Sequence, residues 1–159
     1  MSLDRVKAYL SQFGFSERVL EFAESSATVE LAAAAVGCEP AHIAKSLTFL
    51  VDGHCVMIVA AGDAKVDNQK YKAQFGTKAK MLSPAEAEEH IGLLVGGICP
   101  FAIKEGVEVY LDVSLRRFET VYPAAGSGNS AVGLTCEELE RCAQGVQGWA
   151  DLCKGWQAE

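Results

Sequence analysis

The strongest local signal in the chain is Ser46-Leu47-Thr48-Phe49-Leu50-Val51-Asp52-Gly53-His54-Cys55-Val56-Met57-Ile58-Val59-Ala60-Ala61. Two runs with the composition of β-strands, 46–51 and 54–61, stand on either side of Asp52-Gly53. This dipeptide favours a two-residue hairpin turn, because both turn positions require a positive φ. The sequence therefore predicts an antiparallel hairpin over residues 46–61.

Capping residues and glycines predict where helices begin and end around this hairpin. Thr28 is a candidate N-cap for a helix that ends at Gly37, and both Ser83-Pro84-Ala85-Glu86 and Thr135-x-x-Glu138 have the pattern of a capping box. We expect helices over 4–13, 29–36, 41–45 and 67–75, from 84 onward and from 136 to about 143, and strands over 18–23, 107–112, 119–122 and 131–134, with a short final strand near the C-terminus.

The order of these elements predicts the fold class. Helices and strands mix without the regular strand–helix–strand rhythm of a doubly wound fold, and hairpins favour antiparallel pairing. We therefore expect an α+β fold in which a mixed, curved and partly barrel-like sheet is covered by helices. No repeat, low-complexity tract or Pro/Ser-rich linker divides the 159 residues, which favours one compact domain over 1–159.

Composition argues against several classes of protein. Half of the residues are hydrophobic and 22% are charged, so the chain can bury a core and is not expected to be disordered. The longest apolar run, Cys55 to Ala61, is far shorter than the roughly 20 residues of a membrane span. Residues 1–5 include an acid and no apolar core follows them, so we expect no secretory signal and a cytoplasmic location.

Six cysteines are scattered along the chain, and no two form a C-x-x-C pair. In a cytoplasmic protein this pattern predicts reduced thiols that are mostly buried. A zinc site is the weaker interpretation, because only Cys38 with His42 and His54 with Cys55 lie close in sequence. We expect neither a metal nor a cofactor.

The net charge of −7 argues against a dedicated nucleic-acid-binding protein, because such proteins usually carry an excess of basic residues. The charge is uneven, however: residues 63–80 contain five lysines and two aspartates, whereas 81–90 contain three glutamates and neither lysine nor arginine. The segment 63–80 is therefore either a solvated helix face or a small basic surface for a partner. The candidate contacts on that surface are Lys70, Lys72, Lys78 and Lys80.

The sequence lacks the motifs that usually supply a nucleophile, a metal or a phosphate-binding loop. It contains no G-x-S-x-G, H-E-x-x-H or Walker motif, and no G-x-G-x-x-G after a strand. None of the three histidines adjoins an obvious nucleophile. Cys99 is a candidate thiol nucleophile, but a buried and inert thiol is the favoured interpretation.

Two glycine-rich loops are candidates for a binding site. The paired glycines of Gly96-Gly97-Ile98-Cys99-Pro100-Phe101 let the backbone approach a ligand and direct N–H groups at an anion or a carbonyl oxygen. The second loop, Ala124-Ala125-Gly126-Ser127-Gly128-Asn129-Ser130, offers further hydrogen bonds. Either loop alone is consistent with a simple turn. Together they indicate a site built from backbone dipoles.

Lys45 lies between an expected short helix and the expected core strand, so it should be close to burial. Two interpretations of it stay open. It is either a charge at a helix C-terminus whose side chain extends to solvent, or a cation held for a phosphate or a developing oxyanion.

Taken together, these residues resemble the YbaK-type family, the prolyl-tRNA-synthetase-associated editing domains. The resemblance spans nearly the whole chain in the same order and rests on Thr28, Ala33-Ala34, Gly37, Ile43-Ala44-Lys45-Ser46-Leu47, Gly62-Asp63, Gly96-Gly97-Ile98-Cys99-Pro100 for the family's G-x-x-x-P loop, and Gly126-Ser127 with Asn129-Ser130 for its late glycine loop. Ser46 replaces the threonine or asparagine of many relatives, and Ser130 replaces the histidine of some. These two departures leave the amino-acid preference open.

The resemblance implies a compact α+β domain that hydrolyses mischarged aminoacyl-tRNA, typically tRNA for proline carrying a wrong small amino acid, without a cofactor or a protein nucleophile. The implied partners are the acceptor end of that tRNA and prolyl-tRNA synthetase, and neither DNA nor a membrane is expected. The implied catalytic residues are Lys45, Gly96 and Gly97; the implied substrate-binding residues are Thr28, Ser46, Ile98, Cys99, Pro100, Phe101, Gly126, Ser127, Asn129 and Ser130; and the implied contacts to the tRNA backbone are Lys70, Lys72, Lys78 and Lys80.

Such a reaction is physically reasonable because an aminoacyl ester is already labile. A well-placed water or substrate group can attack it, and backbone donors aimed at the tetrahedral oxygen lower the barrier by roughly 3–4 kcal/mol. A second, smaller site is needed because a missing methylene is worth only about 1–3 kcal/mol to a synthetase. Two alternatives remain: a non-catalytic module that binds an aminoacyl-tRNA or nucleotide end, and a thiol hydrolase that uses Cys99.

Overall fold

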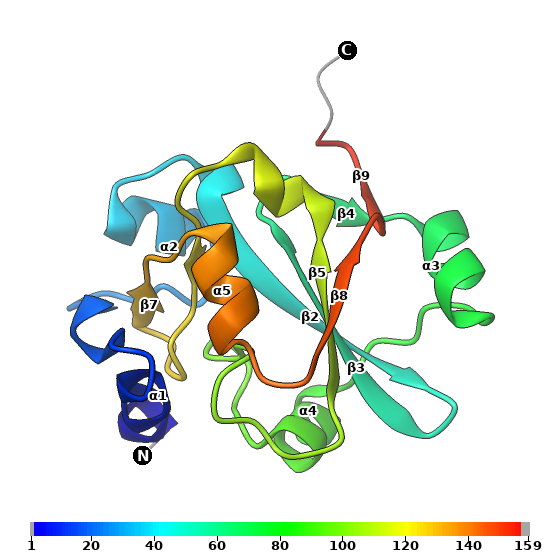
Figure 1. Cartoon of the computed structure of the whole chain (residues 1–159), viewed down its shortest axis with the longest axis horizontal. Coiled ribbons are helices and arrows are strands. Elements are labelled where there is room, and N and C mark those ends of the chain that lie inside the picture. Colours follow the sequence, from blue (N-terminus) through cyan, green and yellow to red (C-terminus); the bar gives the residue numbers. More distant parts are fainter. Residues whose placement is uncertain (1, 157–159) are drawn as a thin grey trace.

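The central sheet of the molecule has five strands in the order β6-β2-β3-β5-β8. In the computed structural model, which describes residues 2–156, these strands are β2 (Ile43–Val51), β3 (His54–Ala61), β5 (Glu108–Asp112), β6 (Tyr122–Pro123) and β8 (Val146–Ala150). The sheet is curved, and helices surround it (Figure 1). The predicted α+β fold with a mixed, curved sheet is confirmed.

The predicted hairpin forms the centre of this sheet. Asp52 and Gly53 have φ values of 48° and 84°, and Val51 pairs with His54 across the turn. Every residue of β3 from Cys55 to Ala61 is at most 4% exposed. The hairpin therefore supplies the most buried strand of the described residues as well as the turn.

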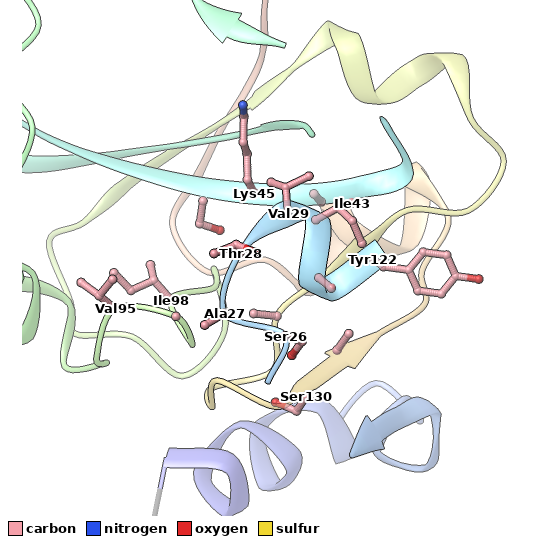
Figure 2. Close-up of a pocket in the computed structure, with 16 residues that line it drawn as sticks. Ser26, Ala27, Thr28, Val29, Ile43, Lys45, Val95, Ile98, Tyr122 and Ser130 are labelled. Carbon is pink, nitrogen blue, oxygen red and sulfur yellow. The ribbon is translucent and has the colours of Figure 1, made fainter. Parts of the chain in front are cut away.

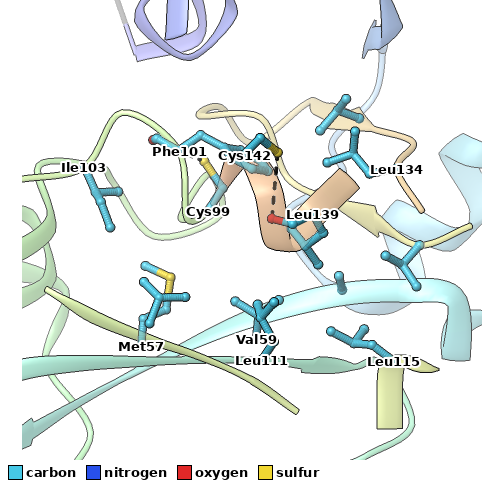
Figure 3. Packing of buried hydrophobic residues seen from close by; sticks show 14 of the residues in the cluster. Met57, Val59, Cys99, Phe101, Ile103, Leu111, Leu115, Leu134, Leu139 and Cys142 are labelled. Atoms are coloured by element: carbon cyan, nitrogen blue, oxygen red, sulfur yellow. Dashed lines mark hydrogen bonds between the residues drawn. The ribbon is translucent and has the colours of Figure 1, made fainter. Parts of the chain in front are cut away.

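Alternate residues of β3 face two different hydrophobic clusters, as the period of two in a strand requires. Met57 and Val59 pack in the larger cluster with α1 (Ser2–Ser11), α4 (Pro84–Ile91) and α5 (Cys136–Cys142), part of which Figure 3 shows. Val56 and Ile58 pack in the smaller cluster with Tyr71 of α3 (Asn68–Phe75). The sheet thus separates α3 from α1, α4 and α5.

The remaining elements are short and lie around this sheet. Strand β1 (Val19–Glu21) pairs with β7 (Ser130–Val132), and β4 (Lys65–Val66) pairs with β9 (Cys153–Lys154). Three 3₁₀-helices span Ser16–Arg18, Pro40–His42 and Val113–Arg117, and α2 spans Val29–Val36. No helix within residues 2–156 has the length and apolar composition that crossing a membrane requires.

The predicted helix caps are confirmed. Thr28 Oγ1 accepts the Leu31 N–H at the start of α2, and Gly37 ends that helix at φ 85°. Both capping boxes, at Ser83 and at Thr135, make their two reciprocal hydrogen bonds. Local sequence patterns therefore determined these boundaries.

The helix predicted over 41–45 is present only as the 3₁₀ turn Pro40–His42; its extension to Lys45 is wrong, and this error concerns the candidate site directly. Strand β2 begins at Ile43, so Lys45 lies in a strand opposite Ala60 rather than at a helix end. A five-residue helix gains little on its own, whereas these residues gain ladder hydrogen bonds and bury Ile43 and Ala44.

Smaller differences concern the strands. The expected antiparallel pairing holds for β2 and β3, but the other three neighbouring pairs of the central sheet are parallel. The strand expected over 18–23 is limited to Val19–Glu21, and the strand expected over 119–122 begins only at Tyr122. Each of these boundaries depends on which strand lies alongside, which local composition does not specify.

Candidate functional site

A small cavity of about 190 Å³ lies beside the N-terminal end of β2 (Figure 2). Its lining comes from four segments that are far apart in the sequence: the segment around the start of α2, the start of β2, the first glycine-rich loop, and residues 122–131. The lining residues are Ser26, Ala27, Thr28, Val29, Ala32, Ile43, Ala44, Lys45, Ser46, Val95, Gly96, Ile98, Tyr122, Ala124, Ser130 and Ala131.

The two glycine-rich loops contact each other next to this cavity. A Cβ atom on Gly97 would lie 2.6 Å from the Gly126 carbonyl carbon and the Ser127 nitrogen, so only glycine permits this backbone approach. Gly96 has φ 99°, and a Cβ there would meet the Ala27 side chain at 3.2 Å. The two loops therefore form one site together with the segment that precedes α2.

Lys45 lies at the rim of the cavity, half-buried on β2. Its ammonium group points away from Ile98 and Ser130 (Figure 2) and donates to the Gly62 carbonyl at 3.4 Å. Gly62 is tightly enclosed, because a Cβ there would lie 2.0 Å from the Pro40 carbonyl oxygen. Burial lowers the pKa of Lys45 below the usual value for lysine. The ammonium group is thus a partly desolvated cation beside the cavity, held at the Gly62 carbonyl and directed away from Ile98 and Ser130 (Figure 2).

Two hydroxyl groups in the lining have no hydrogen-bond partner among the described residues. Ser26, only 6% exposed, and Ser46 both have a buried, unpartnered Oγ. By contrast, the Oγ atoms of Ser130 and Ser127 lie 2.6 Å apart and satisfy each other. A buried unpaired hydroxyl is unfavourable, so a polar ligand in the cavity would compensate both serines.

Strand β2 also has an interrupted edge at the cavity. Ala44 pairs with Pro123 of β6, and farther along the same edge the Thr48 carbonyl accepts the Leu82 N–H. Main-chain groups of alternate residues point to the same edge of a strand, so those of Ser46 point into the interval between these two pairings. Within residues 2–156 no main-chain group pairs with Ser46 there. A free N–H and a free carbonyl are therefore available at the cavity.

The structure places six of the predicted catalytic and substrate-binding residues on the cavity and seven outside its lining. The six lining residues are Lys45, Gly96, Thr28, Ser46, Ile98 and Ser130. The seven others lie behind or beside it and are Gly97, Cys99, Pro100, Phe101, Gly126, Ser127 and Asn129. The N–H of Gly97 is already donated to the Leu94 carbonyl at 3.0 Å, so it is not free to bind a substrate.

Cys99 and Phe101 belong to the hydrophobic core. Both are fully buried, and Figure 3 shows them beside Cys142 and above the central sheet. Burial raises the pKa of the Cys99 thiol to about 12, so the nucleophilic thiolate is scarcely populated at neutral pH. The structure gives the thiol-hydrolase alternative no support.

Several lining residues carry no signal in the sequence. Ser26 and Val95 lie next to candidate segments, but no cap, periodicity or glycine pattern distinguishes them from ordinary loop residues. Tyr122 enters the cavity only because β6 pairs with β2. Finding these residues required the tertiary structure.

The four lysines predicted to contact tRNA do not line one common surface. Lys72 and Lys78 line a common hollow beside α3. Lys70 instead donates to the Asp151 carboxylate and to the Cys153 carbonyl, both at 2.9 Å. Lys80 is exposed, and its carbonyl accepts the Leu50 N–H.

No cluster of three or more potential metal ligands occurs within the part of the chain that the structure describes. The cavity lining contains neither histidine, cysteine, aspartate nor glutamate. Its chemistry therefore comes from a lysine, hydroxyl groups and main-chain dipoles.

Comparisons with known proteins agree on one kind of domain. Residues 23–142 match the family described as the aminoacyl-tRNA editing domain. The chain is 50% identical over 158 residues to the uncharacterized protein YwhH of Bacillus subtilis, covering 99% of this chain and 100% of that protein. It is 30% identical over 146 residues to the multifunctional Ser/Thr-tRNA deacylase ProXp-y of Escherichia coli, covering 88% of this chain and 87% of the relative.

The fold is likewise similar to solved structures. A crystal structure described as a candidate trans-editing enzyme for prolyl-tRNA synthetase superimposes with a TM-score of 0.86 and 31% sequence identity. The superposition covers 97% of this chain and 98% of the other.

Proposed function

Because this chain belongs to the aminoacyl-tRNA editing domain family, as the sequence predicted, we propose that the cavity beside Lys45 is where it removes a wrong amino acid from tRNA. Aminoacyl-tRNA deacylation is the activity of the family and of the Escherichia coli relative. We infer that the tRNA is the one for proline, which the likeness to a candidate trans-editing enzyme for prolyl-tRNA synthetase supports. That synthetase is then the expected partner, in the cytoplasm.

The observation behind this proposal is a small cavity that has one cation at its rim and no histidine, cysteine or carboxylate among its described lining residues. At about 190 Å³ it is below the roughly 300–1,000 Å³ of sites for drug-sized ligands, which suits a small amino acid. We infer that the attacking group is a water molecule or a group of the substrate itself, because the described lining has no histidine, cysteine or carboxylate to activate its hydroxyl groups. Positioning and electrostatics must then supply the catalysis.

Lys45 and the open edge of β2 divide this work between them. The half-buried ammonium group binds a phosphate or ribose oxygen of the terminal nucleotide, which positions the ester at the cavity mouth. The ester carbonyl then lies over the interrupted edge, where the Ser46 N–H and the backbone of Gly96 stabilise the tetrahedral oxyanion. In the hydrolysis, the oxygen of the attacking water forms a bond to the carbonyl carbon, the ester bond to the ribose oxygen breaks, a proton of the water passes to that ribose oxygen, and the amino acid leaves with a free carboxyl group.

The two unpartnered hydroxyl groups support an amino acid that carries a hydroxyl of its own. Serine or threonine can donate to and accept from Ser26 and Ser46, whereas alanine leaves both buried groups unpaired. The name of the Escherichia coli relative, a Ser/Thr-tRNA deacylase, is consistent with this choice.

A deacylation panel tests the proposal. Purified protein is incubated with tRNA for proline that carries serine, threonine, alanine, cysteine or proline, and with seryl-tRNA for serine. We expect rapid release of serine and threonine from tRNA for proline, slow release of alanine, and no release of proline. Lys45→Ala should slow the reaction by roughly 10²–10³-fold, whereas Lys104→Ala, at a position outside the cavity, should not.

Two outcomes of this panel contradict the proposal. A wild-type protein that protects every ester from hydrolysis is a binding module rather than an enzyme. Full activity of Lys45→Ala would remove that lysine from the mechanism.

A further inference from the structure

Two additional hollows continue from the candidate site along the surface. The first, about 290 Å³, shares Lys45 with the site cavity. The second, about 440 Å³, shares Asn68 and Ala79 with the first and reaches α3. The three hollows therefore form a series that begins at the amino-acid cavity. We call the two outer hollows together the lysine groove.

The lysine groove is basic although the protein as a whole is acidic. Its lining contains Lys45, Lys65, Lys72 and Lys78 and no aspartate or glutamate. None of these four ammonium groups is within ion-pair distance of a carboxylate of residues 2–156. Lys70, two residues before Lys72 in α3, is paired with Asp151 instead. A chain with a net charge of −7 thus leaves four cations uncompensated along one path.

The floor of the groove nearest the site is apolar. Leu47 and Phe49 follow Lys45 at alternate positions of β2, and Val66 of β4 lies beside them. Met81 completes this floor and is 60% exposed, so its side chain is accessible to a ligand in the groove. A polyanion alone would not need such a surface, whereas unpaired bases can pack their faces against it.

We propose that the lysine groove binds the single-stranded 3′ end of the substrate tRNA, with the nucleotides that precede the aminoacylated one lying over Met81 and their phosphates beside Lys65 and Lys78. This inference rests on the proposed function, because Lys45 links the groove to the amino-acid cavity. A double-stranded segment would hide its bases and leave the apolar floor uncovered. Of the four lysines predicted to contact tRNA, the groove contains Lys72 and Lys78 but neither Lys70 nor Lys80, and it adds Lys65.

The experiment measures binding of tRNA, and the deacylation panel described above measures hydrolysis separately. Binding of fluorescently labelled tRNA for proline is followed by anisotropy over a series of salt concentrations, for the wild type, for Lys65→Gln/Lys78→Gln and for a control with Lys104→Gln. Lys104 lines none of the three hollows and is likewise a lysine on the surface. A second probe is the same tRNA without its single-stranded 3′ nucleotides. Circular dichroism verifies that each variant is folded.

The double variant should bind the intact tRNA about 10-fold more weakly, and the slope of log K against log salt should fall by about 0.7 for each lysine removed. With the trimmed tRNA the double variant and the wild type should bind equally. Met81→Ala should weaken binding of the intact tRNA by a few-fold at unchanged salt slope, because stacking on an apolar side chain involves no counterion release.

Two results overturn the groove assignment. One is a double variant that behaves like Lys104→Gln with the intact tRNA. The other is an equal loss with intact and trimmed tRNA, because the lysines would then contact the duplex. The deacylation panel decides the proposed function independently. A groove that binds the intact 3′ end without hydrolysis of any ester supports the groove and contradicts the enzyme.

Discussion

Ser26 combines burial with a hydroxyl group that the protein itself does not use. Its Oγ has no partner among the described residues, although the residue is only 6% exposed. A folded protein gains nothing from such a group, because the desolvated hydroxyl loses its hydrogen bonds to water without replacement. Ser26 is therefore better explained by what the cavity binds than by stability.

Substitution of Ser26 by alanine separates these two roles. Ser26→Ala should leave the free energy of unfolding unchanged or slightly higher, since no protein hydrogen bond is lost. The kcat/KM for release of serine should fall by about 3–10-fold, the value of one hydrogen bond of about 0.5–1.5 kcal/mol, while release of alanine is unaffected. Urea unfolding and the deacylation panel measure the two quantities.

Ser130→Ala is the matched control, because its hydroxyl already pairs with that of Ser127. That variant should lose stability rather than selectivity. Equal losses of serine and alanine release in Ser26→Ala would show that Ser26 supports the cavity and does not select its ligand.

At the scale of elements, the site depends on an interruption in one edge of β2. Pairing with β6 ends at Ala44, and on the same edge pairing with the segment around Leu82 begins at Thr48. The opposite edge of β2 is fully paired with β3 through this region, including Lys45 with Ala60. The strand is therefore held rigidly while one residue, Ser46, presents free main-chain groups to the cavity.

Two substitutions at Ser46 distinguish its main chain from its side chain. Ser46→Ala removes the hydroxyl and keeps the N–H, whereas Ser46→Pro removes both and, because that N–H makes no ladder bond, should fold with a similar Tm. If the N–H stabilises the oxyanion, Ser46→Pro should reduce kcat by at least roughly 10²-fold below Ser46→Ala. Single-turnover deacylation and thermal unfolding provide the comparison. Equal rates in two folded variants would exclude the N–H from catalysis.

Elements also show where the sequence was sufficient and where it was not. The caps at Thr28, Ser83 and Thr135 and the turn at Asp52-Gly53 act within a few residues, so local patterns predicted them correctly. The start of β2 depends on strands β3 and β6, and the helix predicted there was wrong for that reason. The unpaired edge at Ser46 depends on the same neighbouring strands, so no local sequence pattern could predict it.

The whole molecule explains why only part of the site could be predicted. The composition of the two glycine-rich loops identified them in the sequence. Their contact through Gly97 and Gly126 depends on the tertiary fold, which composition does not show. Cys99 and Phe101 belong to the same loop by sequence, but the larger hydrophobic cluster takes them into the core. The family resemblance indicated the segments of the candidate site, and packing decided which of their side chains reach the cavity.

The N-terminal and C-terminal parts of the molecule are joined beside this core by a short ion pair. Arg18, at the end of a 3₁₀-helix, donates to the Glu138 carboxylate at 2.7 Å, while the same carboxylate accepts the Thr135 N–H in the α5 capping box. The Arg18 guanidinium, assisted by the Thr135 N–H, lowers the pKa of Glu138 to about 2. The contact therefore links a charge to the stability of the whole fold.

Acid should weaken the fold through Glu138 in a defined range of pH. The carboxyl group titrates near 4.3 in an unfolded chain and near 2 in the folded protein, so its contribution is complete above about pH 4.3 and disappears as the pH falls toward 2. Glu138→Gln keeps a capping acceptor but loses the charge. This variant should be less stable than the wild type at neutral pH, and the difference should shrink between pH 4.3 and 2. Urea unfolding at a series of pH values measures it.

The neighbouring Glu137→Gln is the control, because Glu137 is exposed and takes no part in an ion pair with a described residue. It removes the same formal charge from the same helix turn without the Arg18 contact. If both variants show the same pH dependence, the effect arises from net charge. If only Glu138→Gln shows the pH dependence, the effect arises from the ion pair between the N-terminal segment and α5. Helix α5 packs on the hydrophobic core that also contains Cys99, behind the cavity.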